Sequence, residues 1–295
     1  MKPPPFRYHA PSTLAEALDV LSEVGGEGKV LAGGQSLIPI LSMRLAAPAH
    51  LIDINRLGDE LGALRTDEDG VRVGALARHS AVEHDPDAAR ACPLLRQALQ
   101  HVAHPVIRNR GTVVGSLAHA DPAAEMPAVL ALLGGTVEAA SATGSRAIPA
   151  AEFFTGPLET SLAPGEMALA ARFPALPPRT GTAFVELARR HGDYAICGVA
   201  GMVTLDEAGA VSAARAAYVG LGATPLALDF TDDVAGPAAS DADFSAAGAR
   251  ATASVEPDAD IHATAEYRRH LAGVLTVRAL TAAAAAADGA GGRQR

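Results

Sequence analysis

Two short segments rich in glycine and hydroxyl residues constrain this sequence more than any other feature. The first, residues 31–38 (LAGGQSLI), follows a predicted strand and precedes an apolar segment. Its adjacent glycines, Gly33 and Gly34, can adopt positive φ and turn successive backbone N–H groups into a concave anion-binding nest, with Gln35 and Ser36 as further donors. The segment lacks the lysine of a P-loop and the spacing of a G-x-G-x-x-G fingerprint, and a simple turn is the alternative reading.

The second segment, residues 108–122 (RNRGTVVGSLAHADP), again places small residues and hydroxyls ahead of a predicted helix. Asp121 as N-cap and Pro122 at the first helical position predict that this helix runs to about Leu133. Helix N-termini favour anions, so one hypothesis is that a diphosphate lies between the two segments. The alternative is that Asp121 only caps the helix and Gly115 only forms a turn.

The remaining pattern predicts two domains, as expected for 295 residues when a domain usually takes roughly 100–200. Ser12 is the predicted N-cap of the first helix, and a cluster of proline and glycine over residues 175–181 marks the boundary. Beyond the boundary the sequence predicts three strands and two helices, and then a disordered tail. The predicted strands are 182–187, 197–205 and 214–222, the helices are 244–254 and 264–287, and the tail is 288–295.

Composition excludes several classes of function. The net charge is −9 and the basic residues form no stripe, which excludes a nucleic-acid surface. The two cysteines, Cys92 and Cys197, are too few for an iron–sulfur cluster or a disulfide framework, and a reducing cytoplasm suits them. The sequence has no signal peptide, and no run approaches the ~18 apolar residues of a membrane span. The histidines form no ligand set for a metal, and no motif for a catalytic nucleophile is present.

Four stretches, taken together, resemble the FAD-binding medium subunit of the xanthine dehydrogenase and aerobic carbon monoxide dehydrogenase family. Their order and spacing make the match far more specific than either Gly-rich segment alone, and it covers nearly the whole chain. The stretches are AGGQSLIPILSMRLAAPAHLIDINRL at 32–57, HPVIRNRGTVVGSLAHADPAAEMPA at 104–128, GDYAICGVA at 192–200 and DIHATAEYRRHLAGVL at 260–275.

The resemblance implies an α+β fold in two domains. The first, residues 1–177, is expected to be an FAD-binding domain of the vanillyl-alcohol-oxidase (PCMH) type, with two α/β subdomains at about 1–56 and 57–177. The second, residues 178–287, is expected to be a small α+β domain of the carbon monoxide dehydrogenase flavoprotein type, with a three-stranded sheet and helices.

The resemblance also implies which residues bind FAD, non-covalently. In the family, the first loop and a T-x-G-G-[NS] loop hold the diphosphate, an acidic residue contacts the flavin and an aromatic residue can lie against its ring. Core packing for Tyr194 and helix-dipole stabilisation for Glu125 are the alternatives. The implied cofactor-binding residues are Leu31, Ala32, Gly33, Gly34, Gln35, Ser36, Leu37, Ile38, Thr112, Gly115, Ser116, Asp121, Glu125 and Tyr194.

Two positions depart from the family pattern. Val185 sits where some relatives carry a basic residue. Val114 stands where the family usually has the first glycine of its second pair. If that position needs positive φ, a β-branched residue there is strained, and the two departures predict either weaker FAD binding or a second loop of different shape.

The resemblance implies a cytoplasmic electron-transfer subunit of a molybdenum hydroxylase. Partner subunits would carry the iron–sulfur clusters and the molybdenum cofactor, and a dimer of heterotrimers is expected. Two alternatives are a flavin-binding structural subunit without redox role and a free-standing flavoprotein. The substrate and the terminal electron acceptor cannot be read from this chain.

Overall fold

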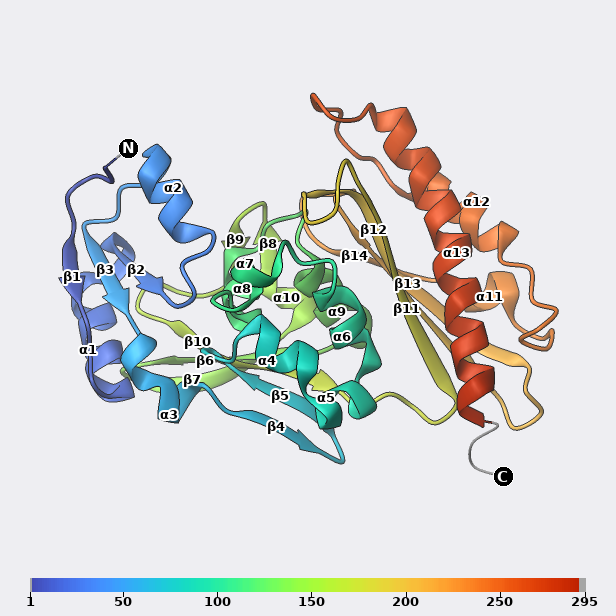
Figure 1. Ribbon diagram of the computed structural model, residues 1–295, viewed down its shortest axis with the longest axis horizontal. Coiled ribbons are helices and arrows are strands. Elements are labelled where there is room, and N and C mark those ends of the chain that lie inside the picture. Colours follow the sequence, from blue (N-terminus) through green and yellow to red (C-terminus); the bar gives the residue numbers. More distant parts are fainter. Residues whose placement is uncertain (1, 292–295) are drawn as a thin grey trace.

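The computed structural model describes residues 2–291, and its elements fall into three sheets with their covering helices, plus a two-stranded ribbon (Figure 1). The first sheet has the order β1-β3-β2 and is parallel throughout. Its elements and the short 3₁₀ turns beside them are β1 (Arg7–His9), α1 (Leu14–Val24), η1 (Gly25–Glu27), β2 (Gly28–Leu31), α2 (Leu37–Met43), β3 (His50–Asp53), η2 (Asn55–Leu57) and α3 (Gly58–Leu61).

The N-cap of α1 is Thr13, so the prediction of Ser12 is wrong by one residue. The Thr13 Oγ1 accepts a hydrogen bond from the Glu16 backbone N–H at 3.2 Å, and the Glu16 carboxylate accepts one from the Ser12 N–H at 2.6 Å. This reciprocal arrangement is a variant of the capping box, in which the glutamate reaches one residue further back.

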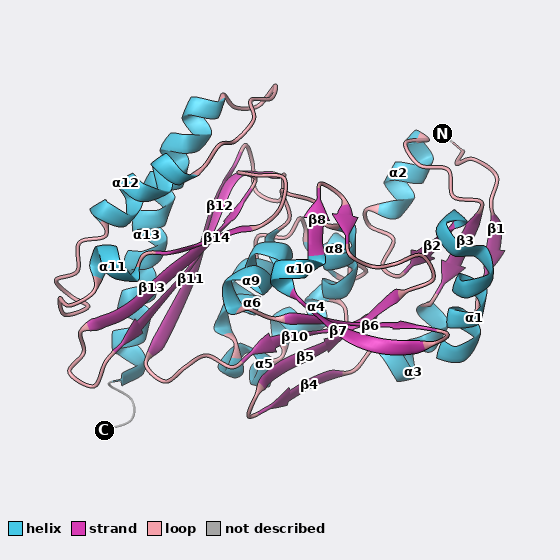
Figure 2. Ribbon diagram, turned by 180° about the vertical axis from the view of Figure 1, so that it is seen from behind, coloured by secondary structure: helices cyan, strands magenta, loops and turns pink. Residues whose placement is uncertain are grey.

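The second sheet has the order β4-β5-β10-β6-β7 and is antiparallel throughout. Helices from the middle of the chain cover one face of it (Figure 2). The elements of this part are β4 (Leu64–Asp67), β5 (Gly70–Gly74), α4 (His79–His84), α5 (Pro86–Ala91), α6 (Pro93–Leu99), α7 (Pro105–Arg108), α8 (Val113–His119), α9 (Glu125–Leu133), β6 (Thr136–Ser141), β7 (Gly144–Pro149), α10 (Ala150–Phe153), β8 (Phe154–Gly156), β9 (Glu159–Thr160) and β10 (Met167–Pro174).

The third sheet has four strands in the order β11-β12-β13-β14, not the predicted three. The additional strand, β14, has only four residues and pairs with the end of β13, so its sequence signal is weak. The elements here are β11 (Thr180–Ala188), β12 (Ala195–Leu205), β13 (Val211–Val219), β14 (Leu226–Asp229), α11 (Thr231–Val234), α12 (Ser245–Ser254) and α13 (Ala265–Gly291).

Strand β12 is buried along almost its whole length because both faces of the third sheet are covered. Side chains on one face, among them Phe184 and Ala200, join the core that the first two sheets and their helices share, where α9 packs on the third sheet. Side chains on the other face, among them Val199 and Val203, pack under α13 and α12. The third sheet is therefore packed firmly against the rest of the molecule (Figure 1).

Helix α13 is long and apolar enough to cross a membrane by length and composition, so the prediction that no run approaches that length is wrong. Its apolar window is 56% buried inside the protein, against β11 and β12. The alanine run lies so close to the sheet that a β-carbon on Gly181 would stand 2.1 Å from the Ala283 carbonyl oxygen. The helix continues to Gly291, past the predicted end at Asp288, and residues 292–295 of the predicted tail lie outside the described residues.

Candidate functional site

The first Gly-rich segment connects β2 to α2 and has the shape of an anion nest. Gly34 has a φ of 73°, which favours glycine, and the backbone N–H groups of Gly34, Gln35 and Ser36 donate to no acceptor within residues 2–291. The Gln35 side chain donates to the Gly33 carbonyl at 3.0 Å, so its amide closes the loop on itself. Exposed Ser36 begins α2 without a side-chain cap. The free donors are thus mainly backbone groups.

A pocket of about 420 Å³ opens at this segment. It brings together six of the predicted residues, whereas Ser36 and Leu37 do not line it. It also adds four residues that the sequence reading missed, from β3, from the turn after it, from α2 and from the second segment. The lining residues are Leu31, Ala32, Gly33, Gly34, Gln35, Ile38, Pro39, Asp53, Asn55 and Arg110.

The second segment is not a single loop, because residues 113–119 form helix α8. Thr112 is the N-cap of α8 and accepts a hydrogen bond from the Gly115 backbone N–H at 3.0 Å. Thr112 is buried, while Gly115 and Ser116 are half-buried, and none of the three lines either described pocket.

The prediction that Asp121 is the N-cap of the next helix is wrong. Helix α9 begins at Glu125 with Ala124 as its N-cap, and the Asp121 carboxylate instead accepts from the Ala123 N–H at 2.9 Å. The Ala124 N–H closes the turn on the Asp121 carbonyl at 3.0 Å. Asp followed by Pro suits the first two positions of a β-turn as well as a helix start, so the sequence could not separate the two.

Val114 does not have the backbone strain that a positive φ would cause. Val114 lies inside α8, is buried in the core and is not among the residues with positive φ. A β-branched residue fits a short buried helix at little cost, so the departure from the family pattern gives no reason to expect weak FAD binding.

The two Gly-rich segments meet backbone to backbone. A β-carbon on Gly33 would stand 2.3 Å from the Arg110 carbonyl oxygen and 2.8 Å from the Gly111 Cα. Only glycine permits this approach. Free amide donors, a cradle that a β-carbon would fill and the nearby Arg110 cation are what a diphosphate requires, so these residues fit FAD.

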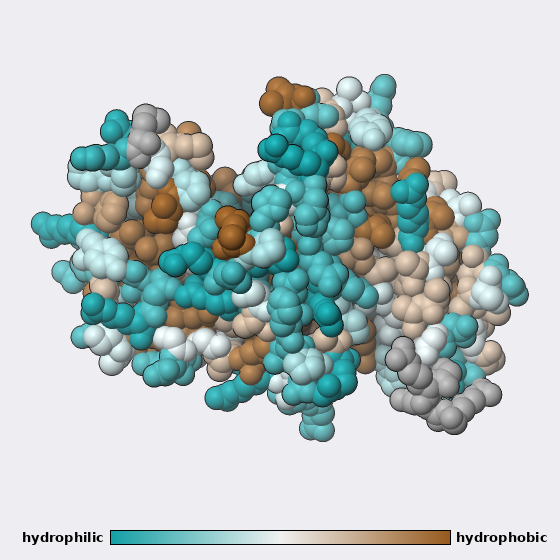
Figure 3. All heavy atoms as spheres, viewed as in Figure 1, coloured by the Kyte–Doolittle hydropathy of each residue, from teal (hydrophilic) through white to brown (hydrophobic). Residues whose placement is uncertain are grey.

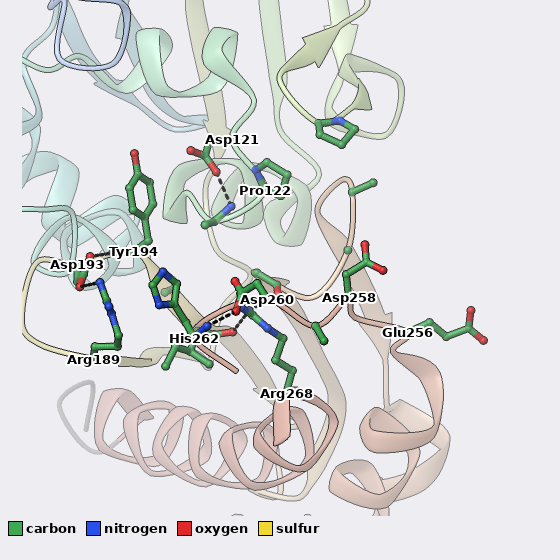
Figure 4. A pocket seen from close by; sticks show the side chains of 18 residues that line it. Asp121, Pro122, Arg189, Asp193, Tyr194, Glu256, Asp258, Asp260, His262 and Arg268 are labelled. Atoms are coloured by element: carbon green, nitrogen blue, oxygen red, sulfur yellow. Dashed lines mark hydrogen bonds and ion pairs between the residues drawn. The ribbon is translucent and has the colours of Figure 1, made fainter. Parts of the chain in front are cut away.

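A second pocket, of about 680 Å³, lies between the Asp121 turn and the loop that precedes α13 (Figure 4). The space-filling view shows a hollow in the outline of the molecule between that loop and the part of the chain that carries α2 (Figure 3). Tyr194 lines this pocket and is 70% exposed, so the core alternative for its ring is excluded. Asp121 lines the same pocket, whereas Glu125 does not. Partial burial and then the charges of Asp121 and Glu125 raise the pKa of Tyr194.

Glu125, at the start of α9, and Glu186 of β11, which was not predicted from the sequence, are carboxyl groups with raised pKa values. Burial, offset in part by a backbone hydrogen bond and reinforced by Asp121, raises the pKa of Glu125 to about 7. Burial and then the charge of Glu125 raise the pKa of Glu186 to about 8, and Glu186 Oε2 is buried without a hydrogen-bond partner among the described residues. The only indication of this residue in the sequence is that a glutamate interrupts the apolar run of β11.

His79 was also missed and lies directly under the second segment. It is 5% exposed, and neither ring nitrogen has a hydrogen-bond partner among the described residues. Its Nδ1 would stand 3.0 Å from a β-carbon on Gly111, and its backbone N–H donates to the Gly111 carbonyl at 2.9 Å. Burial lowers the pKa of His79 to about 4, so the ring is neutral at physiological pH. A single histidine carries no signal in the sequence that would identify this position.

Comparison with known proteins agrees with this architecture. Residues 4–176 match the FAD binding domain in molybdopterin dehydrogenase, and residues 182–283 match the CO dehydrogenase flavoprotein C-terminal domain. The chain is 40% identical to the 6-hydroxypseudooxynicotine dehydrogenase complex subunit alpha of Paenarthrobacter nicotinovorans, over 96% of each chain.

Solved structures give the same result. The chain superposes on a chain of quinoline 2-oxidoreductase from Pseudomonas putida 86 with a TM-score of 0.89, 37% identity and coverage of 98% of this chain and 99% of that one. For CO dehydrogenase from Oligotropha carboxidovorans the TM-score is 0.90, with 34% identity and coverage of 97% and 100%. The expected family and fold are confirmed, and the chain belongs to the family of FAD-binding medium subunits of molybdenum-containing dehydrogenases.

Proposed function

We propose that this chain is the FAD-bearing electron-transfer subunit of a multi-subunit molybdenum dehydrogenase. The observation that carries the proposal is the nest of free amides at Gly34, Gln35 and Ser36, closed against the second segment at Gly33. When bound there, FAD supplies the redox chemistry, and the protein supplies position and electrostatics.

Each predicted contact has a role in this proposal. Residues 31–38 offer backbone donors to the diphosphate and apolar surface around it, while Thr112, Gly115 and Ser116 shape the facing segment. Tyr194, accessible at the mouth of the larger pocket, lies against the flavin ring. Glu125, whose pKa burial raises to about 7, contacts the polar edge of the flavin beside Asp121.

The partners follow from what this chain carries and from how its relatives are named. Cys92 and Cys197 are both buried and lie in separate cores, and a cluster usually takes four thiolates. Relatives are named as the alpha subunit of a dehydrogenase complex and as the medium chain of carbon monoxide dehydrogenase. These observations support the proposal that an iron–sulfur small subunit and a molybdenum large subunit complete the enzyme. We further propose a dimer of heterotrimers in the cytoplasm.

The experiment is to purify the chain alone and load it with FAD. It should be yellow and release intact FAD on acid treatment, yet fail to oxidise purines, aldehydes or carbon monoxide. Substrate turnover by the lone chain would identify a free-standing flavoprotein instead. A chain that takes up FAD but, in the assembled complex, is not reduced when substrate is added would have a structural role only.

A further inference from the structure

Two residues outside the Gly-rich segments, Asn55 and Arg78, connect those segments through their side chains. Asn55 follows β3, and its Nδ2 donates to the Ala32 carbonyl of the first segment at 2.9 Å. Arg78 precedes α4, and its Nη1 donates to the Arg110 carbonyl of the second segment at 2.7 Å. Between them, Arg78 Nη2 donates to Asn55 Oδ1 at 2.7 Å, and the three hydrogen bonds form a bridge from one segment to the other.

The Asn55 side chain is fixed from its other side as well. The Asp53 carboxylate accepts from the Asn55 backbone N–H at 2.9 Å and from its Nδ2 at 2.6 Å. The second oxygen of the same carboxylate accepts from the Tyr8 hydroxyl at 2.6 Å. A side chain with this many defined partners has little freedom to turn, so the bridge is a rigid spacer.

The bridge acts at the point where the two segments touch. The Arg110 carbonyl that Arg78 holds is the one that faces Gly33, where a β-carbon would stand only 2.3 Å away. The backbone of Arg78 also forms an isolated antiparallel bridge with Thr112, the N-cap of α8. Arg78 therefore positions both the start of the second segment and its distance from the first.

We propose that Arg78 and Asn55 are positioning residues that hold the two segments at the spacing at which both reach the FAD diphosphate. They act through the Ala32 and Arg110 carbonyls rather than as ligands themselves, since the bridging atoms of both side chains are engaged within the protein. The proposal rests on the proposed function, because it concerns how the same FAD site is built.

The test is a double-mutant cycle with the full chain, in which the dissociation constant for FAD is measured by flavin fluorescence. Arg78→Met and Asn55→Ala should each weaken FAD binding about tenfold or more, the loss expected when one hydrogen bond to a polar group is removed. Because both variants break the same bridge, the double variant should bind FAD about as weakly as the single variant with the lower affinity.

The control variant is Arg146→Met. Arg146, on strand β7 of the second sheet, makes two hydrogen bonds to Glu166 and one to the Ser161 carbonyl, and none of these partners belongs to either segment. It should lower the melting temperature of the flavin-free chain without changing the FAD dissociation constant. Arg78→Lys separates charge from geometry, and it should bind FAD more weakly than wild type.

The outcomes are distinct. Single variants that bind FAD like wild type, losses that multiply in the double variant, or full retention of affinity in Arg78→Lys would each overturn the positioning role. A wild-type chain that binds no FAD would instead refute the proposed function.

Discussion

Replacing Gly33 by alanine should separate the two segments that hold the diphosphate. The added β-carbon would stand 2.3 Å from the Arg110 carbonyl oxygen, 2.8 Å from the Gly111 Cα and 3.0 Å from the Arg110 carbonyl carbon. All three are backbone atoms that cannot swing aside. To reach an ordinary contact of about 3.5 Å, the segments must move apart by about 1 Å.

The consequence for FAD is larger than the consequence for folding. Forcing extra volume into a packed contact costs about 1–3 kcal/mol of stability. A shift of about 1 Å also breaks at least one backbone hydrogen bond to a charged phosphate, worth about 1.5–3 kcal/mol, so FAD should bind at least ~10-fold more weakly.

Two measurements on Gly33→Ala check this reasoning, a fluorescence titration with FAD and a melting curve of the flavin-free chain. Gly26→Ala is the matched control, because a β-carbon there meets nothing within 4 Å and Gly26 has no positive φ. If Gly33→Ala binds FAD as tightly as Gly26→Ala does, the diphosphate does not lie between these segments at this spacing.

Three further predictions concern other parts of the site. Tyr194→Ala should change the unfolding free energy by no more than about 0.5 kcal/mol, because the ring is 70% exposed, yet alter flavin reduction or reoxidation in the assembled complex; a large stability loss with unchanged kinetics contradicts this. Gly115→Ala and Thr112→Ala should each lower the free energy of unfolding by about 1 kcal/mol, because the new β-carbon at residue 115 would stand 2.5 Å from the Thr112 Oγ1 and break the cap; additive losses in the double variant would show that the cap is not the cause. In the unfolded chain His79 binds a proton below its usual pKa of 6.5, whereas burial lowers its pKa in the folded chain to about 4, so the free energy of unfolding should fall by about 3 kcal/mol between pH 7 and pH 4. Urea titrations of His79→Leu should lack this part of the pH dependence, and a pH dependence equal to that of the wild type would show that another group causes it.

The sequence predicted the first segment well because its signal is local. Two adjacent glycines between a strand and an apolar helix leave few other conformations, and Gly34 adopts the expected positive φ. The second segment was harder, because Thr112 starts a helix in a stretch of β-branched residues and Asp121 suits a turn as well as a cap.

The residues that were missed owe their roles to tertiary contacts. Asn55 and Arg78 lie in separate connections, after β3 and before α4, and meet only in the folded chain, where Arg78 Nη2 donates to Asn55 Oδ1. Glu186 is significant only because the third sheet buries it beside Glu125. No spacing within the sequence encodes such contacts, so the sequence alone does not predict them.

The most direct test of the account compares FAD with riboflavin, which has the flavin ring but no diphosphate. Titrating the flavin-free chain with each ligand gives two dissociation constants under the same conditions. If the segments at Gly34 and Thr112 hold the diphosphate, FAD should bind with a stoichiometry of one per chain and at least ~100-fold more tightly than riboflavin, since about two charge-assisted hydrogen bonds supply that difference. Equal affinity for the two ligands, or no uptake of FAD, would contradict the central claim.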